Sequence, residues 1–358
     1  MTQRGVLCID IHTTLQSVLF RYSGADFTEM PRFALPSPSE ILARRVAEAT
    51  VNRRDIFLAG PAMGREFLPA LAGHLRAGSR VGMEERCALA LYKTTEDAAV
   101  SGIEILEGCP DGYMFIPTGD VDMAFWRGLC RMLALEEPPV TAVAAMDTGE
   151  GQTSGNTGCP GSMWFWQELM RGYADTGVPP QAFLLAEAPV TMPRLAAIQA
   201  ATRGLVTDTG IAALLGLLGD AAIRERSFRQ GVVLLSVSDV HITAFLVWRG
   251  RVFGMYEHHT DSVSKDKVIH DLTEFRLGWL PDESVRDSGG HGTAFAILPP
   301  EAEGFPVMYI TGRCAKLFAE SGILADGRDP SFTGCLGLAH AVDLAEDRMV
   351  DAEGCCDT

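Results

Sequence analysis

The chain of 358 residues is short of basic side chains, with 30 Lys and Arg against 46 Asp and Glu and a formal net charge of −16. The basic residues form no stripe along the sequence. Nucleic acids and anionic membrane surfaces bind proteins through clustered basic side chains. The composition therefore argues against both as partners, although it defines no substrate.

Long apolar runs and a targeting signal are also lacking. The most apolar helix-like segment, residues 211–223, is interrupted by Gly219 and Asp220 and is too short to span a bilayer. The first strand is entered by Val6, without a basic start, a long apolar stretch and a small-residue cleavage site. We therefore expect a cytoplasmic protein.

Paired cysteine motifs are missing as well. The chain has nine cysteines and no C-x-x-C pair. Cys8, Cys87, Cys130 and Cys335 lie in apolar stretches, which predicts reduced thiols in the core.

What the sequence does contain is an internal repeat. Residues 6–27 and 232–253 align without a gap. Each segment predicts an apolar strand, a short polar turn, a second strand (16–22 and 242–248), a glycine and then a third strand. The sequence therefore predicts an antiparallel three-strand meander that occurs twice.

Strands and helices alternate after each meander. The first is followed by a helix at 37–53, capped by Ser37 or Ser39, and by a buried strand ending at Gly60. The second is followed by a helix at 264–278, a strand ending at Gly312 and another helix. This alternation predicts parallel strands added to each sheet, with helices on both faces.

The length and the 47% hydrophobic content allow about two domains. We predict them at 1–155 and 156–358, because residues 151–161 form a Gly/Ser/Thr/Asn-rich linker candidate.

Two such meanders that face each other across a cleft resemble the superfamily of acetate and sugar kinases, heat-shock chaperones and actin. The resemblance implies an α/β fold of two RNase H-like (actin-like ATPase) halves around a central cleft. It also implies that ATP and Mg²⁺ bind in the cleft, with the two hairpins holding the phosphates.

A closer resemblance covers nearly the whole chain. It is to an uncharacterised prokaryotic family of this superfamily, labelled pyruvate formate-lyase activating enzyme-like, and its motifs are "LPSPSEI", "DIFLAGPAMG", "GDVD", "DTGIAALLG", "GMYEHHT", "GGHG", "YITG" and "TGCLGL". True activating enzymes of that kind are radical enzymes with a C-x-x-x-C-x-x-C motif, which this chain lacks. We therefore reject a radical mechanism.

The resemblance implies roles for particular side chains. Asp10 would orient a metal-bound water or hydroxyl, Gln16 would contact a phosphate or water, and Asp147 would complete the catalytic set. Asp10, Asp147 and Asp208 would hold Mg²⁺ through water. The implied nucleotide contacts are His12, Thr13, Thr14, Ser238, Asp239, His241 and Gly312.

A simpler role competes for the acidic residues, because Asp at a strand or helix end commonly closes a turn or caps a helix. The alternative applies to Asp10, Asp147 and Asp208, and also to Asp120 and Asp122 before the helix predicted within 118–137.

Both phosphate turns depart from the family pattern. His12 and Thr14 replace the glycines of the first turn, and Ser238 and Val240 replace those of the second. Branched side chains disfavour a positive φ and occupy space where a phosphate oxygen would approach the backbone. The substitutions indicate that the phosphate grip is weakened or abandoned.

The histidines of the matching segments are His241, His258, His259 and His291. His258 and His259 are neighbours in a predicted strand and point to opposite faces, so at most one of them faces the cleft with His241. A His/Asp metal site, an acid–base pair and satisfied structural histidines are the alternatives. No H-x-x-x-H or H-x-H spacing links the four.

Three functions follow from these observations. The family-level expectation is ATP binding in the cleft with phosphotransfer or hydrolysis. The alternatives are a non-catalytic scaffold or regulatory partner that keeps the cleft, and a His/Asp metal-binding protein. The expected partner is a small molecule or nucleotide in the cleft, with a protein partner or a homodimer left open.

Overall fold

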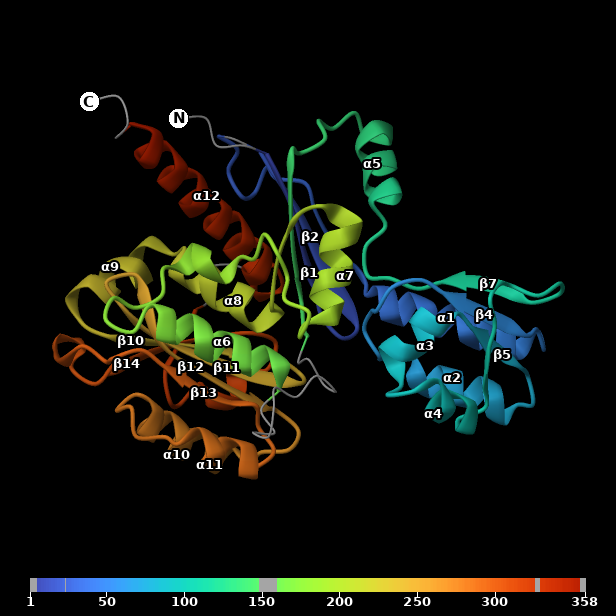
Figure 1. Ribbon diagram of the computed structural model, residues 1–358. Helices are drawn as coiled ribbons and strands as arrows, with labels where there is room; N and C mark the ends of the chain where they lie inside the picture. Colours follow the sequence, from blue (N-terminus) through green and yellow to red (C-terminus); the bar gives the residue numbers. More distant parts are fainter. Residues whose placement is uncertain (1–4, 23, 148–159, 326–328, 355–358) are drawn as a thin grey trace.

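The structure is a computed structural model that describes residues 5–22, 24–147, 160–325 and 329–354. Within these residues the main strands form three sheets. Two sheets and their helices make up the body of the molecule, and the third belongs to a separate lobe at the right of Figure 1.

The first sheet of the body has the strand order β3-β2-β1-β8-β9. Strands β1 and β2 and strands β2 and β3 pair antiparallel, whereas β8 and β9 are added parallel beside β1. The strands are β1 (Val6–Ile11), β2 (Leu15–Arg21), β3 (Arg32–Pro36), β8 (Val140–Ala145) and β9 (Leu205–Thr207).

The second sheet repeats this order with an additional edge strand, as β13-β12-β11-β10-β14-β15. Strand β14 lies parallel to β10, as β8 lies parallel to β1. The strands are β10 (Val232–Val237), β11 (His241–Trp248), β12 (Arg251–His259), β13 (Gly292–Phe295), β14 (Val307–Thr311) and β15 (Ile323–Leu324).

The two hairpins have the same register. Val6 pairs with Arg21 in the first hairpin, and the residues aligned with them, Val232 and Val247, pair in the second. Each turn is closed by the same backbone hydrogen bond, from His12 N to Leu15 O and from Ser238 N to His241 O, both at 2.9 Å. The predicted fold class, two RNase H-like halves of the actin-like type, is confirmed.

The third strand of the first meander exists and pairs antiparallel with β2, but its predicted position directly after Gly24 was wrong. Residues 25–27 lie in an irregular turn region, and β3 begins only at Arg32. In the second meander Arg249 and Gly250 both have a positive φ and connect β11 directly to β12. The first connection is longer, so the gapless alignment holds for the hairpins but not beyond them.

The strand ending at Gly60 was also misplaced. We predicted that it joins the first sheet, but the place beside β1 is occupied by β8. The segment instead forms β4 (Ile56–Ala59) of a separate parallel sheet of order β6-β5-β4-β7, which has its own apolar core. Its other strands are β5 (Val81–Met83), β6 (Ile103–Ile105) and β7 (Met114–Pro117).

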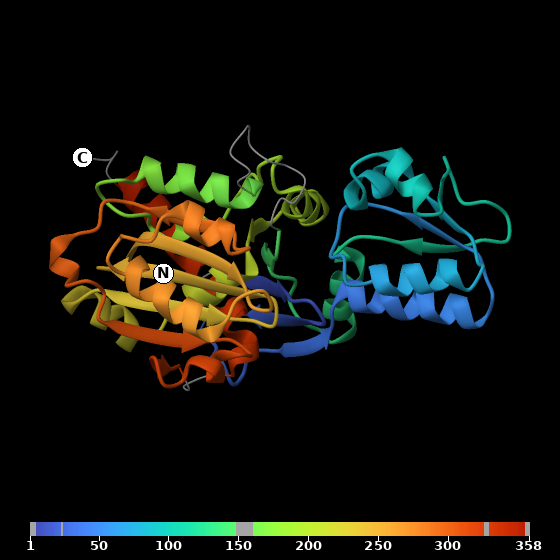
Figure 2. The ribbon, with the colours of Figure 1, turned by 90° about the horizontal axis from the view of Figure 1, so that it is seen from below.

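Helices α1 (Pro38–Val51), α2 (Leu68–Arg76), α3 (Glu85–Leu91) and α4 (Thr95–Val100) complete this lobe. Figure 2 shows the lobe standing beside the body, to which the chain connects it at both ends. The Ser37 hydroxyl accepts a hydrogen bond from Glu40 N at 3.1 Å, which confirms one of the two predicted caps for α1.

Helices cover both faces of the second sheet. On one face Leu234 and Phe245 pack with α8, and on the other Leu235 and Ala244 pack with α10. The body helices are α5 (Met123–Met132), α6 (Gly161–Gly172), α7 (Pro193–Thr202), α8 (Thr209–Leu218), α9 (Ala221–Arg229), α10 (Lys265–Phe275), α11 (Asp282–Asp287) and α12 (Thr333–Gly354). The helix predicted after Gly312 is only a short 3₁₀ turn, η4 (Ala315–Phe318).

The last helix, α12, packs against α8 and against β1 and β8 of the first sheet. The Arg21 guanidinium on β2 forms a salt bridge of 2.7 Å with Asp343 of α12. The end of the described chain thus lies against its beginning (Figure 1). One continuous core of buried side chains joins the two halves.

The predicted domain boundary does not coincide with the division of the sheets. The boundary at residue 155 and most of the linker candidate 151–161 lie outside the described residues. Strand β9 comes after this boundary and nevertheless belongs to the first sheet. The first half therefore takes chain from both predicted domains.

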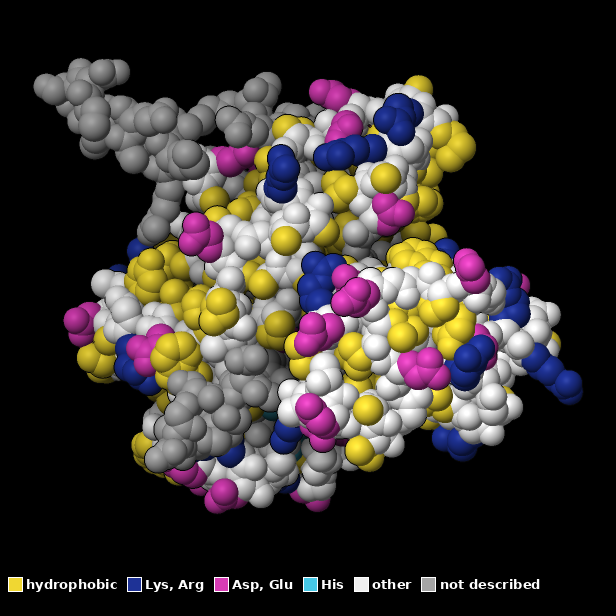
Figure 3. Space-filling model, turned by 45° about the vertical axis from the view of Figure 1, so that its right-hand side comes forward, with side chains coloured by type: hydrophobic (Ala, Val, Ile, Leu, Met, Phe, Trp, Pro, Cys, Tyr) yellow, Lys and Arg dark blue, Asp and Glu magenta, His cyan; other side chains and the backbone are white. Residues whose placement is uncertain are grey.

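The four cysteines predicted in the core, Cys8, Cys87, Cys130 and Cys335, are buried and free. None of the helices in the described part of the chain is long and apolar enough to cross a membrane. Acidic and basic side chains are interspersed over the face seen in Figure 3.

Candidate functional site

The two hairpin turns meet in the body and leave little space between them. The cavity that they line measures about 50 Å³ and also touches Gly312. Arg313 spans the two turns, because its Nη1 lies 3.4 Å from the Thr14 hydroxyl and 3.2 Å from the Asp239 carboxylate. Ligand pockets usually measure roughly 300–1,000 Å³. The cavity therefore does not fit the phosphates of a nucleoside triphosphate together with Mg²⁺.

The turns do not need the missing glycines. None of His12, Thr14, Ser238 and Val240 has a positive φ. In the second turn the Ser238 hydroxyl accepts hydrogen bonds from His241 N at 2.9 Å and from Val240 N at 3.3 Å. The chain thus forms these corners with ordinary backbone conformations, and their side chains fill the space between them.

Asp10 is 1% exposed and is surrounded by groups of the protein itself. Its carboxylate accepts a hydrogen bond from the Thr209 hydroxyl and lies 3.1 Å from His12 Nε2. The negative charge of Asp10 raises the pKa of His12. A Cβ at Gly334 would overlap the Asp10 carboxylate, so α12 closes over it.

Gln16 does not join Asp10. Asp10 pairs with Ser17 across the hairpin, and successive side chains of a strand point to opposite faces. Ser17 therefore shares the small cavity with Asp10, whereas Gln16 lines a different cavity of about 700 Å³. The Gln16 amide donates a hydrogen bond of 3.0 Å to Pro36 O. The predicted contact of Gln16 with a phosphate or water would therefore lie in a different cavity from Asp10.

Asp147 and Asp208 each cap a helix. Asp147 accepts hydrogen bonds from Arg194 N at 2.7 Å and Leu195 N at 3.0 Å at the start of α7. Asp208 accepts one from Gly210 N at 2.7 Å at the start of α8. Burial, together with the charge of Glu257, raises the pKa of Asp208 to about 7. Among the described residues, Asp10, Asp147 and Asp208 do not form a cluster that could coordinate one ion directly.

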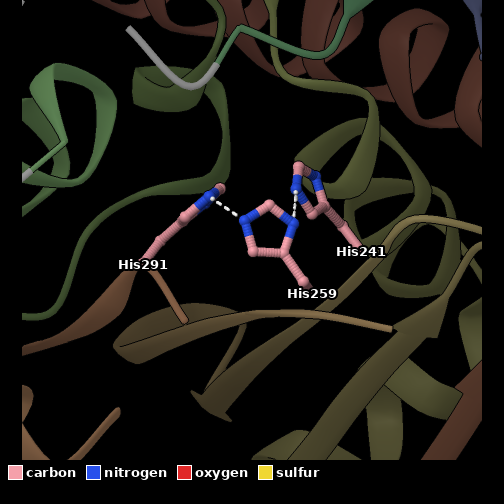
Figure 4. A group of neighbouring side chains, drawn as sticks. All are labelled: His241, His259 and His291. Carbon is pink, nitrogen blue, oxygen red and sulfur yellow. Dashed lines mark hydrogen bonds between the residues drawn. The ribbon is translucent and has the colours of Figure 1, made fainter. Parts of the chain in front are cut away.

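A different cluster does form at the ends of the strands of the second sheet. His241 begins β11 and pairs with His259 at the end of β12. His291 immediately precedes β13, which pairs with β12 through Glu257 and Gly292. Three neighbouring strands thus bring together three histidines that lie far apart in the sequence (Figure 4).

The ring nitrogens of these histidines are close to one another. His241 Nε2 lies 3.0 Å from His259 Nδ1, and His291 Nε2 lies 3.0 Å from His259 Nε2. One nitrogen from each ring can be chosen so that all three lie within 4.8 Å. His241 is 6% exposed and His291 is 4% exposed, so both rings are withdrawn from solvent.

Glu257 lies behind the cluster and is 4% exposed. Its carboxylate oxygens are 3.2 Å from His291 Nδ1 and 3.7 Å from His241 Nδ1. Burial alone would raise the pKa of Glu257, but His291 and His241 reverse this effect and lower it to about 2. Burial lowers the pKa of His241 to about 4.

His258 is directed elsewhere, as the strand alternation predicts. Its Nε2 lies 3.1 Å from the Ser288 hydroxyl. Only His259 of this adjacent pair joins His241.

The sequence interpretation missed Glu257. It stands two residues before His259 and therefore on the same face of β12, which is the signal that could have identified it. It also missed the role of Asp120, which forms a bidentate ion pair with Arg194 of α7 at 2.8 and 2.9 Å. Asp122, in contrast, caps α5 through hydrogen bonds from Ala124 N and Phe125 N.

A cavity of about 210 Å³ opens beside the histidines, where the lobe meets the body. His241 and His259 form part of its wall. The other lining residues are Ala62, Met63, Gly64, Arg65, Glu66 and Ala90 of the lobe, and Met146, Asp147, Pro193, Arg194 and Val240 of the body. The cluster is therefore accessible to a small molecule.

Several solved structures are similar to this chain over most of its length. An inorganic polyphosphate/ATP-glucomannokinase from Arthrobacter sp. strain KM is 11% identical, with 96% of this chain and 100% of that chain covered and a TM-score of 0.34. A ROK hexokinase from Thermus thermophilus is 11% identical, with 96% of this chain and 99% of that chain covered and a TM-score of 0.31. An apo ParM protein of psk41 is 10% identical, with 96% of this chain and 98% of that chain covered and a TM-score of 0.32.

No curated protein matches the chain. One protein family does match, over residues 63–316, which is more than two thirds of the sequence. Its description is "Putative pyruvate format-lyase activating enzyme (DUF1786)". The chain belongs to this family.

Proposed function

We propose that the protein is a metalloprotein that binds one divalent transition-metal ion, with Zn²⁺ as the reference ion, through His241, His259 and His291. The observation that carries the proposal is the convergence of these three rings, each within 3.0 Å of a neighbouring ring. Imidazole nitrogen is a common ligand of Zn, Cu, Fe and Ni.

The protons of the cluster support this proposal. The Glu257 carboxylate favours a proton on Nδ1 of His291 and of His241, so the neutral rings present a lone pair at Nε2. Both lone pairs face His259, and a neutral imidazole has only one N–H to donate. A neutral His259 can therefore donate a hydrogen bond to only one of the two neighbouring rings, and two nitrogen lone pairs face each other at the other contact. A metal ion, or a second proton on His259, would remove this repulsion.

The geometry suits the metal. Zn–N bonds of about 2.0–2.1 Å in a tetrahedral shell separate the nitrogens by about 3.3 Å. The two observed contacts of 3.0 Å involve different nitrogens of His259, and the three nitrogens that one ion could share, one from each ring, lie within 4.8 Å of one another. Binding one ion therefore requires His259 to turn so that a single nitrogen faces the other two rings. Carboxylates behind the ligating histidines are a common outer layer of metal sites. Glu257 lies in such a position, 3.2 Å from His291 Nδ1 and, beyond hydrogen-bond distance, 3.7 Å from His241 Nδ1.

The nucleotide function receives less support. The cavity of about 50 Å³ between the hairpins does not fit ATP together with Mg²⁺. Radical chemistry is a separate question, and the chain lacks the cysteine motif of radical activating enzymes. We therefore derive no phosphotransfer step.

Metal analysis of the purified protein tests the proposal. We expect about one equivalent of a transition metal by elemental analysis, and a lower melting temperature after chelation that added Zn²⁺ restores. His259→Ala and His291→Ala should lose the metal. His270→Ala is the matched control, because His270 is exposed on α10 and pairs only with Glu274 among the contacts described. No bound metal, together with no effect of Zn²⁺ on melting, would contradict the proposal and favour a protonated His259.

A further inference from the structure

We infer that the metal centre keeps one coordination position open to the 210 Å³ cavity, and that this position takes a small carboxylate bearing an adjacent hydroxyl or amine group. The inference rests on the proposed metal function and names the class of ligand that the centre serves.

The cluster offers only three protein ligands among the described residues. A tetrahedral ion bound by three histidines requires a fourth ligand. Within residues 5–22, 24–147, 160–325 and 329–354 no fourth His, Cys, Asp or Glu joins the group. Glu257 contacts Nδ1 of His241 and His291, on the side of each ring away from the converging Nε2 atoms. It therefore supports the ligands rather than filling the vacant direction.

The 210 Å³ cavity borders two of the three histidines. His241 and His259 form part of its wall, and the opposite wall comes from the lobe. Structural zinc sites are enclosed by four protein ligands, whereas catalytic sites present three and leave a position for water or substrate. An ion at this cluster would face a space large enough for a molecule of a few heavy atoms.

The charges around the cavity define the ligand. Arg65 and Arg194 in the cavity wall are balanced by Glu66 and Asp147, and Arg194 also pairs with Asp120. A divalent ion at the histidines would therefore supply the net positive charge that favours an anionic group. Glu66 Oε2 is a buried oxygen without a hydrogen-bond partner, and Glu66 lines the same cavity. A ligand that satisfies it must carry an O–H or N–H. A carboxylate with a neighbouring hydroxyl or amine has both features.

Cobalt-substituted protein tests the inference, because the visible absorption of Co²⁺ reports its ligands. Two probes separate the parts of the claim. Azide binds an open metal position without offering a hydrogen-bond donor, and lactate adds a carboxylate with an adjacent hydroxyl. We expect each probe to change the cobalt spectrum in a saturable manner.

Variants of the lobe identify the contacts. Glu66→Gln should weaken lactate binding about tenfold and leave azide binding within twofold. Glu104→Gln, an exposed position on β6 of the same lobe, is the matched control and should change neither. Ala90→Phe, which narrows the cavity from α3 without replacing a histidine, should weaken both probes while the protein still binds cobalt.

The outcomes separate the two proposals. Failure of cobalt to bind would overturn the metal function itself. Stoichiometric cobalt with a spectrum that neither probe changes would leave the metal function standing and overturn the open position. Azide binding without lactate binding, or equal lactate affinity in Glu66→Gln and the parent protein, would overturn the ligand class.

Discussion

His340 and His12 are both half-buried, but their surroundings move their pKa values in opposite directions. Burial, with a smaller effect of Arg224, lowers the pKa of His340 to about 4. The unfolded chain binds a proton on this histidine below about pH 6.5, whereas the folded chain resists it. Stability should therefore fall by roughly 3 kcal/mol between pH 6.5 and pH 4 because of this residue. In denaturant titrations His340→Gln should show a shallower loss over this range, and an unchanged slope would contradict the assignment.

His12 should give the opposite dependence. The charge of Asp10 raises the pKa of His12, so the folded state binds its proton more tightly than the unfolded chain does. This contribution is complete below about pH 6.5 and is lost as the pH rises through the raised value. His12→Gln should therefore destabilise the protein more at pH 6 than at pH 9 when free energies of unfolding are compared. An equal loss of unfolding free energy at pH 6 and pH 9 would show that Asp10 does not raise the pKa of His12 in the folded state.

Gly312 illustrates a backbone requirement at a single position. Its φ is 103°, and a Cβ there would overlap the Val237 carbonyl oxygen at the end of β10. Gly312→Ala should cost about 2–3 kcal/mol of unfolding free energy. Gly24→Ala is the control, because Gly24 also has a positive φ but nothing within 4 Å of its Cβ position, and it should cost only about 1 kcal/mol. Equal costs would show that crowding at Val237 is unimportant.

The hairpins are the elements on which the nucleotide question depends. Native protein should show no thermal shift with millimolar Mg·ATP, because side chains fill the space between the turns. The quadruple variant His12→Gly, Thr14→Gly, Ser238→Gly and Val240→Gly should bind ATP measurably more tightly in calorimetry. Arg249→Gly is a control in another turn, where the residue already has a positive φ. Unchanged or weaker ATP binding by the quadruple variant would contradict our account of these corners.

Local patterns predicted the hairpins well because each needs only short-range information. Alternating apolar residues and a polar turn place β1 beside β2 and β10 beside β11. The sheet that β4 joins depends instead on which strand occupies the place beside β1, a long-range choice that the sequence around residue 56 does not contain. The separate lobe was also not predicted, because its residues were assigned to the first half and only the pairing of its four strands with one another reveals a third sheet.

The candidate site was predictable only in part for a related reason. The histidines were identified as residues with metal chemistry, and the face of His259 followed from alternation. Their convergence required the pairing of β11 with β12 and of β12 with β13, which no sequence spacing reveals. Gln16 was predicted to contact a phosphate or water as part of one catalytic set with Asp10, but the register of the hairpin puts the two side chains on opposite faces.

The attachment of the lobe to the body is a property of the whole molecule. Asp120 follows the last strand of the lobe, and its bidentate pair with Arg194 of α7 is buried. Removing one partner leaves the other charge buried and unpaired, so Asp120→Ala should cost about 3–5 kcal/mol of unfolding free energy. Asp120→Ala combined with Arg194→Met should recover part of this loss. Glu40→Ala, which breaks the exposed pair with Arg44, should cost less than about 1 kcal/mol, and a similar cost for Asp120→Ala would contradict this assignment.

The packing of α12 on β1 has a consequence for how the protein is made. Because the chain is synthesised from its amino end, the first sheet emerges from the ribosome long before the helix that covers it. Cys335 of α12 contacts the backbone of Cys8 and Ser17, so this surface stays uncovered until α12 has been synthesised. Folding of the amino-terminal half therefore cannot be completed before α12 is available, and nascent chains that lack this helix are expected to expose an apolar surface.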